Sequence, residues 1–180
     1  MSSVILSGDT SGTVTVAAPS VAGTNTVTLP AASGVIQVSG AMPVFSAYSS
    51  SGQTLSNNTW TKIAFQTEEF DTNSNYDNAT NYRFTPTVAG YYQVGGAISL
   101  GASPSYASCS LYKNGARFKD GVQAGSSANA LSELTASALI YFNGSTDYVE
   151  FYALQASGGS STTSAGAYYT YFQAVMVRGA

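Results

Sequence analysis

The sequence of residues 65–100 is FQTEEFDTNSNYDNATNYRFTPTVAGYYQVGGAISL, and it predicts two extended runs separated by a corner. Pro86 cannot donate a hydrogen bond to a neighbouring strand, and Gly90 permits a tight reversal of the backbone. The run after Gly90 alternates in side-chain character. Because successive side chains of a strand point to opposite sides, one face of this run can fill a core. The residues of that face are Tyr92, Val94, Ile98 and Leu100.

Residues 71–81 have a different composition, dominated by Asp, Asn, Ser and Thr. These side chains bond back to their own backbone, so the segment predicts a long surface loop. Its D-x-N-x-N-x-D spacing is typical of calcium loops and makes Asp71 and Asp77 calcium candidates. However, Tyr76 and Tyr82 stand where an EF-hand has its glycine and its bidentate glutamate. We therefore expect a hydrogen-bonded loop and no required metal or cofactor.

Motifs in residues 42–180 resemble the complement 1q-like head, a jelly roll of the tumour necrosis factor superfamily. The central signature matches at Phe70, Asp71, Asn73, Tyr76, Asp77, Phe84, Thr85, Pro86, Val88, Gly90, Tyr91 and Tyr92. Residues 44–47, 111–115 and 172–174 resemble further pieces in family order. The turn from Gly144 to Asp147 carries two more residues than the family pattern. The resemblance implies a homotrimer, in which the sheet with the first, third, sixth and last strands packs about a threefold axis.

The rest of residues 42–180 is rich in aromatic residues and strand-forming, with no helical period. It predicts an all-β fold, a two-sheet antiparallel jelly-roll sandwich. Asn114-Gly115 is the clearest hairpin signal, because both residues accept the positive φ angles of a primed turn. The expected strands are residues 43–48, 60–66, 82–86, 90–100, 106–113, 130–142, 147–155 and 168–178.

Residues 1–41 form a separate segment of short β-branched runs broken by Gly and Pro. Strands this short cannot bury enough apolar area alone, so they need partners. The phrases GTVTVAAP and AGTNTVTLP resemble N-terminal segments of phage tail and head fibre proteins. We interpret the segment as a stalk that attaches to other virion proteins, and the alternative is a plain β-linker.

The composition excludes several classes of function. Only 8% of the 180 residues are charged and the net charge is −3, which argues against a nucleic-acid or anionic-membrane surface. The absence of histidine rules out His-based catalysis and metal sites, and one cysteine cannot form a zinc cluster. Two carboxylates across a groove could still serve a glycosidase. The N-terminus lacks a signal-peptide pattern and nothing is long enough to span a membrane.

Aromatic residues on both faces of a strand indicate that both faces are covered. Large side chains occur this way in the last strand and at residues 91–92. Because the chain is too small for a third layer, the second face is predicted to meet another subunit. The candidate trimer-interface residues are Tyr91, Tyr92, Tyr169, Tyr171 and Phe172.

Small polar tracts at residues 121–129 and 156–166 predict loops, either merely flexible or exposed at one end of the sandwich for binding. The candidate surface-binding residues are Asp71, Asn73, Tyr76, Asp77, Ser157 and Ser160. Together these features predict a trimeric, non-enzymatic phage fibre or spike, made in the host cytoplasm and displayed on the virion. Its head would bind a host-surface glycan or protein through many weak contacts. The alternatives are a decoration protein without a receptor and a glycan depolymerase.

Overall fold

The computed structural model describes residues 3–28, 31, 36–101, 104–125 and 132–180, and the chain forms two compact units, residues 1–34 and 35–180. The first unit contains a hairpin of β1 (Ser3–Ser7) and β2 (Thr13–Ala17), which pair antiparallel from Ser3 opposite Ala17 to Ser7 opposite Thr13. Among the described residues, no helix is long and apolar enough to cross a membrane. The one helical element of these residues is a 3₁₀ turn, η1 (Ser39–Ala41).

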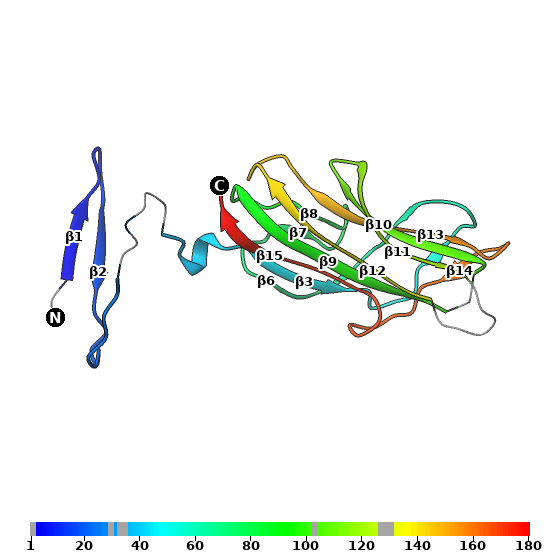
Figure 1. The fold of residues 1–180 in the computed structure, drawn as a ribbon, viewed down its shortest axis with the longest axis horizontal. Helices are drawn as coiled ribbons and strands as arrows, with labels where there is room; N and C mark the ends of the chain where they lie inside the picture. Colours follow the sequence, from blue (N-terminus) through cyan, green and yellow to red (C-terminus); the bar gives the residue numbers. More distant parts are fainter. Residues whose placement is uncertain (1–2, 29–30, 32–35, 102–103, 126–131) are drawn as a thin grey trace. The chain divides into compact units, whose positions relative to one another are not determined.

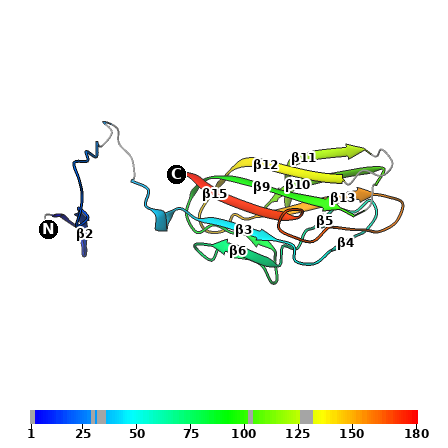
Figure 2. The same ribbon diagram turned by 90° about the horizontal axis from the view of Figure 1, so that it is seen from below.

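The second unit, called the head from here on, is a sandwich of two antiparallel sheets, as predicted (Figure 1). The five-stranded sheet has the order β12-β9-β15-β3-β6, and the second sheet has the order β11-β10-β13-β8-β7 with β5 also pairing β13. The order of the first sheet can be followed in Figure 2. The strands are β3 (Val44–Tyr48), β4 (Thr54–Leu55), β5 (Thr61–Lys62), β6 (Thr67–Asp71), β7 (Tyr76–Asp77), β8 (Arg83–Phe84), β9 (Gly90–Leu100), β10 (Tyr106–Lys113), β11 (Ala116–Gly125), β12 (Ser132–Phe142), β13 (Val149–Ala156), β14 (Ser161–Thr162) and β15 (Tyr171–Gly179).

The core lies between the two sheets and is built largely from aromatic rings. Phe172 contacts Phe45, Phe65 and Phe151, with ring centroids 5.2, 5.4 and 6.0 Å apart. The alternation predicted for β9 is confirmed, because its core-facing residues are fully buried: Tyr92, Val94, Ile98 and Leu100. Cys109 is also buried, and burial raises the pKa of its thiol to about 12, so this cysteine is a core side chain.

The predicted turn at Asn114-Gly115 is confirmed, with φ angles of 53° and 76°, and it joins β10 to β11. The reversal expected at Gly90 is wrong. Gly90 has no positive φ and instead begins β9 opposite Gly179. A Cβ on Gly90 would collide with the carbonyl oxygen of Arg178 and the side chain of Met176. Glycine is therefore required there for a close approach of two strands.

Several strands escaped prediction because their sequences are polar. Residues 116–125 form the ten-residue strand β11, so residues 121–125 of the tract expected to be a loop belong to a strand, and residues 126–129 of that tract lie outside the described residues. The strand expected at residues 60–66 is reduced to the two residues of β5. The five residues of β6 and the short β7 lie in segments interpreted as loop or left unassigned. Their order is imposed by pairing with β3 and β8.

Candidate functional site

The outer face of the five-stranded sheet carries large apolar side chains that the described residues of the head leave partly exposed. Strand register places Tyr91 opposite Tyr141, and it places Gln93 between Leu139 and Val175. The exposed fractions of the apolar members lie between 41% and 57%. We call these six residues the apolar face: Phe70, Tyr91, Leu139, Tyr141, Val175 and Val177.

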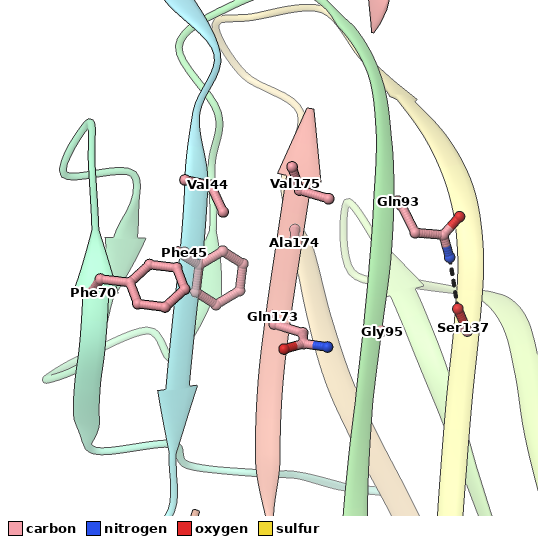
Figure 3. Close-up of a pocket in the computed structure, with 9 residues that line it drawn as sticks. All are labelled: Val44, Phe45, Phe70, Gln93, Gly95, Ser137, Gln173, Ala174 and Val175. Atoms are coloured by element: carbon pink, nitrogen blue, oxygen red, sulfur yellow. Dashed lines mark hydrogen bonds between the residues drawn. The ribbon is translucent and has the colours of Figure 1, made fainter. Parts of the chain in front are cut away.

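A hollow of about 270 Å³ lies in the middle of this sheet, beside the apolar face (Figure 3). Gly95 forms its floor, since it has no side chain, and Gln93, Ser137 and Gln173 stand around it. The side-chain amide of Gln93 donates to the hydroxyl of Ser137 at 2.6 Å. The hollow is lined by neutral residues and has no carboxylate, so it offers shape and hydrogen bonds rather than acid–base chemistry.

Two of the five residues predicted for the trimer interface lie elsewhere. Tyr92 and Phe172 are completely buried between the sheets of their own chain, because they point inward from β9 and β15. Tyr91 is exposed on the apolar face, on the opposite side of β9 from Tyr92. Tyr171 is half-buried at the start of β15. Tyr169 lies in the turn before β15, with its ring 4.5 Å from that of Tyr168.

Strand alternation in the sequence could have identified the residues of the apolar face that were not predicted. In residues 132–142, Leu139 and Tyr141 alternate with the buried Ile140 and Phe142, so a strand there must present two large apolar side chains outward. Val175 and Val177 alternate in the same way around the buried Met176. Strand periodicity therefore identifies an apolar outer face, whereas a search for adjacent aromatic residues selects core positions as well.

The loop after β6 is held by its own hydrogen bonds, in line with the interpretation from its composition. The carboxylate of Asp71 accepts from the backbone N–H groups of Asn73 and Tyr76 at 3.3 and 2.7 Å. Asp77 accepts from the N–H groups of Thr80, Ala79 and Asn81, and these bonds lower the pKa of its carboxyl to about 2.

Two of the residues predicted as surface contacts in this loop, Asn73 and Tyr76, form hydrogen bonds within the head. Tyr76 is only 6% exposed, and its hydroxyl donates to the carbonyl of Phe65, so it is a core residue and not a surface contact. Asn73 is half-buried, with its amide donating to the carbonyl of Gly40. In the part of the chain that the structure describes, no cluster of His, Cys, Asp or Glu has the makings of a metal site.

The candidate binding loops lie at opposite ends of the head. The loop of Asp71 adjoins Val44, at the end of the sheet where β9 begins. Ser157 and Ser160 are exposed and precede β14, and Thr163 just after it bridges Leu100, the last residue of β9. The structure therefore does not bring the two loops into one site.

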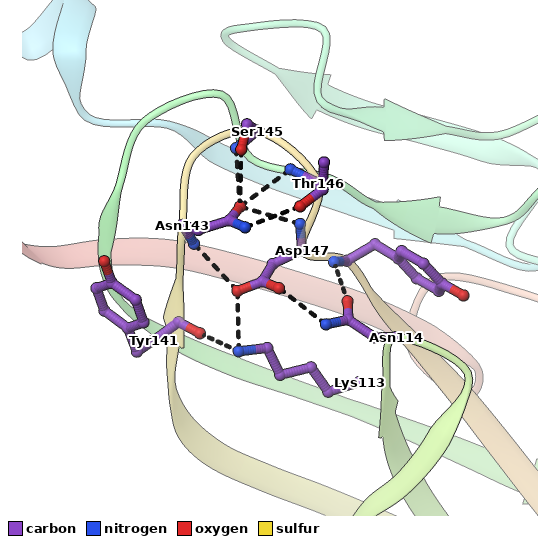
Figure 4. A network of polar contacts seen from close by, with 8 residues as sticks. Lys113, Asn114, Tyr141, Asn143, Ser145, Thr146 and Asp147 are labelled. Carbon is purple, nitrogen blue, oxygen red and sulfur yellow. Dashed lines mark hydrogen bonds and ion pairs between the residues drawn. The ribbon is translucent and has the colours of Figure 1, made fainter.

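The longer turn between β12 and β13 has a defined geometry (Figure 4). The side-chain oxygen of Asn143 accepts from the backbone N–H groups of Ser145, Thr146 and Asp147 at 3.0 to 3.1 Å, and Gly144 has a φ of 73°. A hydrogen bond from Asn114 and an ion pair with Lys113 at 3.0 Å hold the pKa of Asp147 below its usual value. The turn thus accommodates its two additional residues through hydrogen bonds to the side chain of Asn143.

Comparison with known proteins rests on structure. No protein-family model matches the sequence, and no curated protein matches it either. Solved structures do match. Murine APRIL at pH 5.0 aligns with a TM-score of 0.60 at 8% identity, over 76% of this chain and 99% of that chain. The chain therefore has the jelly-roll fold of the tumour necrosis factor and complement 1q domains.

Two further solved structures also match this fold. The globular domain of zebrafish complement 1qA protein aligns with a TM-score of 0.57 at 15% identity, over 77% of this chain and 98% of that chain. Eiger TNF from S. frugiperda also has a TM-score of 0.57, at 12% identity over 77% of this chain and 93% of that chain. The resemblance stated from the head motifs is thus supported at the level of fold.

Proposed function

We propose that the chain is a trimeric, non-enzymatic fibre or spike protein of a phage virion, whose head binds the host surface. The apolar face is the observation that carries the trimeric part of this proposal. Six large apolar side chains, each at least 41% exposed, lie on the outer face of one sheet, outside the buried core of the head. Exposed apolar surface of this kind is typical of a protein interface.

Two further copies of the same chain are the occupant that fits this face. The hollow at the centre of the sheet is lined by neutral polar side chains, Gln93, Gln173 and Ser137, so it presents no charge that assembly would have to desolvate. The nearby carboxylate of Glu69 on β6 accepts a hydrogen bond from the hydroxyl of Ser46 at 2.7 Å. The fold supports the same arrangement, because the family resemblance implies threefold packing through the sheet that contains the first and last strands of the head. Here β3 and β15 pair side by side in that sheet.

The hairpin of the first unit supports the attachment part of the proposal. Val4 pairs with Val16 and Leu6 with Val14, so one face of this two-stranded sheet is entirely apolar, and all four side chains are more than half exposed. A two-stranded hairpin is at best marginally stable alone in water. We propose that this face is completed by other virion proteins.

Deletion of the first unit tests that division of roles. A chain beginning at residue 35 should remain folded and keep binding to host cells, because its core lies within residues 35–180. It should fail to join virions in a complementation assay. A truncated head that melts many degrees lower than the full chain would show that the hairpin belongs to the head.

Five of the eight acidic residues of the head are engaged in ion pairs or loop hydrogen bonds, which favours binding over catalysis at these positions. Glu150, Asp120 and Asp147 each form an ion pair, with Lys62, Arg117 and Lys113 respectively. Asp71 and Asp77 are held by the backbone of their own loop. A carboxylate engaged in this way is a weak proton donor or base.

Two assays separate the three candidate functions. A host-cell binding assay combined with a reducing-sugar release assay on host-surface glycans should show binding without release. Release of sugar would indicate a depolymerase, and absence of both activities would indicate a decoration protein. Immunogold labelling of the parent particle should place the protein on a tail or head appendage, and labelling confined to the host cytosol would contradict a virion role.

A further inference from the structure

The outer face of the second sheet carries a cluster of aromatic rings that the assembly proposal does not use. Tyr112 and Tyr152 stack with centroids 3.9 Å apart and an interplanar angle of 23°, and Trp60 lies 6.1 Å from Tyr112. All three side chains are partly exposed. We call Trp60, Tyr112 and Tyr152 the aromatic platform. Its members come from three distant segments and meet because β10 and β5, which follows Trp60 directly, both pair with β13.

Two ion pairs flank the aromatic platform. On one side the guanidinium of Arg117 lies 4.5 Å from the Trp60 ring centroid and forms a two-pronged pair with Asp120, at 2.6 and 2.8 Å. On the other side Lys62 pairs with Glu150 at 3.1 Å, and the hydroxyl of Tyr152 donates to the same carboxylate at 3.4 Å. The Glu150 side chain is only 6% exposed, so this polar group is fixed beneath the rings.

The composition makes this cluster unusual within the chain. The sequence has 15 charged residues, from six basic and nine acidic, and a single tryptophan. Four of those charges and the tryptophan meet at this one place on a face that points away from the core. The apolar face is on the other sheet, so assembly through it would leave the aromatic platform open to solvent.

We propose that the aromatic platform binds a neutral saccharide ring. The C–H face of a pyranose is apolar and packs on an aromatic ring, while its hydroxyl groups exchange hydrogen bonds with planar charged groups, here the exposed side chains of Arg117 and Asp120. Two cations and two carboxylates cancel here, which matches a ligand without net charge. This inference rests on the proposed surface-binding role and places its ligand class on the sheet face instead of the end loops.

The fluorescence of the single tryptophan can be used to measure saccharide binding. We expect the Trp60 fluorescence of the full-length protein to change saturably with methyl α-D-glucoside, methyl β-D-galactoside or N-acetylglucosamine, with a Kd on the order of 1 mM for so small a ligand. Arg117→Ala and Tyr112→Ala should weaken that binding at least tenfold. Arg178→Ala and Tyr168→Ala are the matched controls, since these exposed residues lie outside the platform, and they should leave it unchanged.

Thermal melting of each variant separates a binding role from a structural one. If the platform only supports the sheet, Tyr112→Ala will lower the melting temperature and no glycoside will give a saturable change in any variant, which would overturn the inference. Saturable binding of N-acetylneuraminic acid alone would also overturn it, because the ligand would then be anionic. A protein that binds host cells but none of these sugars fails this inference only, whereas a protein that binds neither fails the proposed function too.

Discussion

The two sheets of the head share one core but differ on their outer faces. The five-stranded sheet presents the apolar face, with Gln93 and Gln173 as its central polar residues. The second sheet, together with β5, holds five of the six basic residues of the chain and also the aromatic platform. These basic residues are Lys62, Arg83, Lys113, Arg117 and Lys119.

This difference shows where function is specified in a sandwich. The inner faces of both sheets are governed by the same demand, to fill a common core with apolar side chains. The outer faces do not have to fill the core, so their side chains can differ according to the partner or solvent that each face contacts. We interpret the five-stranded sheet as the side for assembly and the second sheet as the side for recognition.

The largest expected effect tests the distinction between inner and outer faces of β15. Phe172→Ala should lower the free energy of unfolding by about 3–5 kcal/mol, because a buried ring is lost from the core and a cavity remains. Val177→Ala, at a position 51% exposed on the outer side, is the control and should cost far less in the isolated head. Urea unfolding measures both. Equal losses would contradict the assignment of Phe172 to the core.

A smaller effect is expected where β9 begins beside the end of β15, in the interior of the five-stranded sheet. Gly90→Ala should destabilise the head by about 1–3 kcal/mol, since the added Cβ collides with the backbone of Arg178. Gly159→Ala is the matched control, because a Cβ there meets nothing within 4 Å. Thermal melting compares the two variants. An unchanged melting temperature for Gly90→Ala would mean that the strands separate there at no cost.

The smallest expected effect concerns the loop of Asp77. Its folded-state pKa of about 2 lies below the ordinary value of 3.8, so the ionised carboxylate stabilises the fold above about pH 4. That contribution should shrink as the pH falls from about 4 to 2 and disappear below the folded-state pKa. Asp77→Ala should therefore cost below about 1 kcal/mol at pH 7, because the group is near solvent, and clearly less at pH 2, where the folded carboxyl is half protonated. Asp9→Ala controls for the loss of one charge, and a cost independent of pH would contradict the account.

Strand bounds and inward-facing residues that follow from side-chain alternation could be predicted from the sequence. Strands whose order depends on pairing with a neighbour could not. The bounds of β9 and β10 and the inward residues of β9 followed from apolar periodicity and an Asn-Gly turn. β11 was missed because its residues are mostly exposed and its order comes from pairing with β10. The interface candidates Tyr92 and Phe172 were wrong because size and aromaticity do not distinguish the two sides of a strand.

The aromatic platform could not be predicted from the sequence for a related reason. Trp60, Tyr112 and Tyr152 are separated by about forty to fifty residues, and nothing in their local sequence indicates that they meet. Only the register of β10 and β5 against β13 brings them together. In the same way, the loops of Asp71 and Ser157 have similar compositions but lie at opposite ends of the head.

Sedimentation equilibrium of the full chain at micromolar concentration tests the central claim most directly. We expect three times the chain mass of 18.5 kDa for the wild type. Val175→Glu should shift the protein to a folded monomer, because it buries a charge in the apolar face, while Val122→Glu, at a valine equally exposed on the second sheet, should leave the trimer intact. A monodisperse wild-type monomer, or a trimer that Val175→Glu does not disturb, would contradict the account.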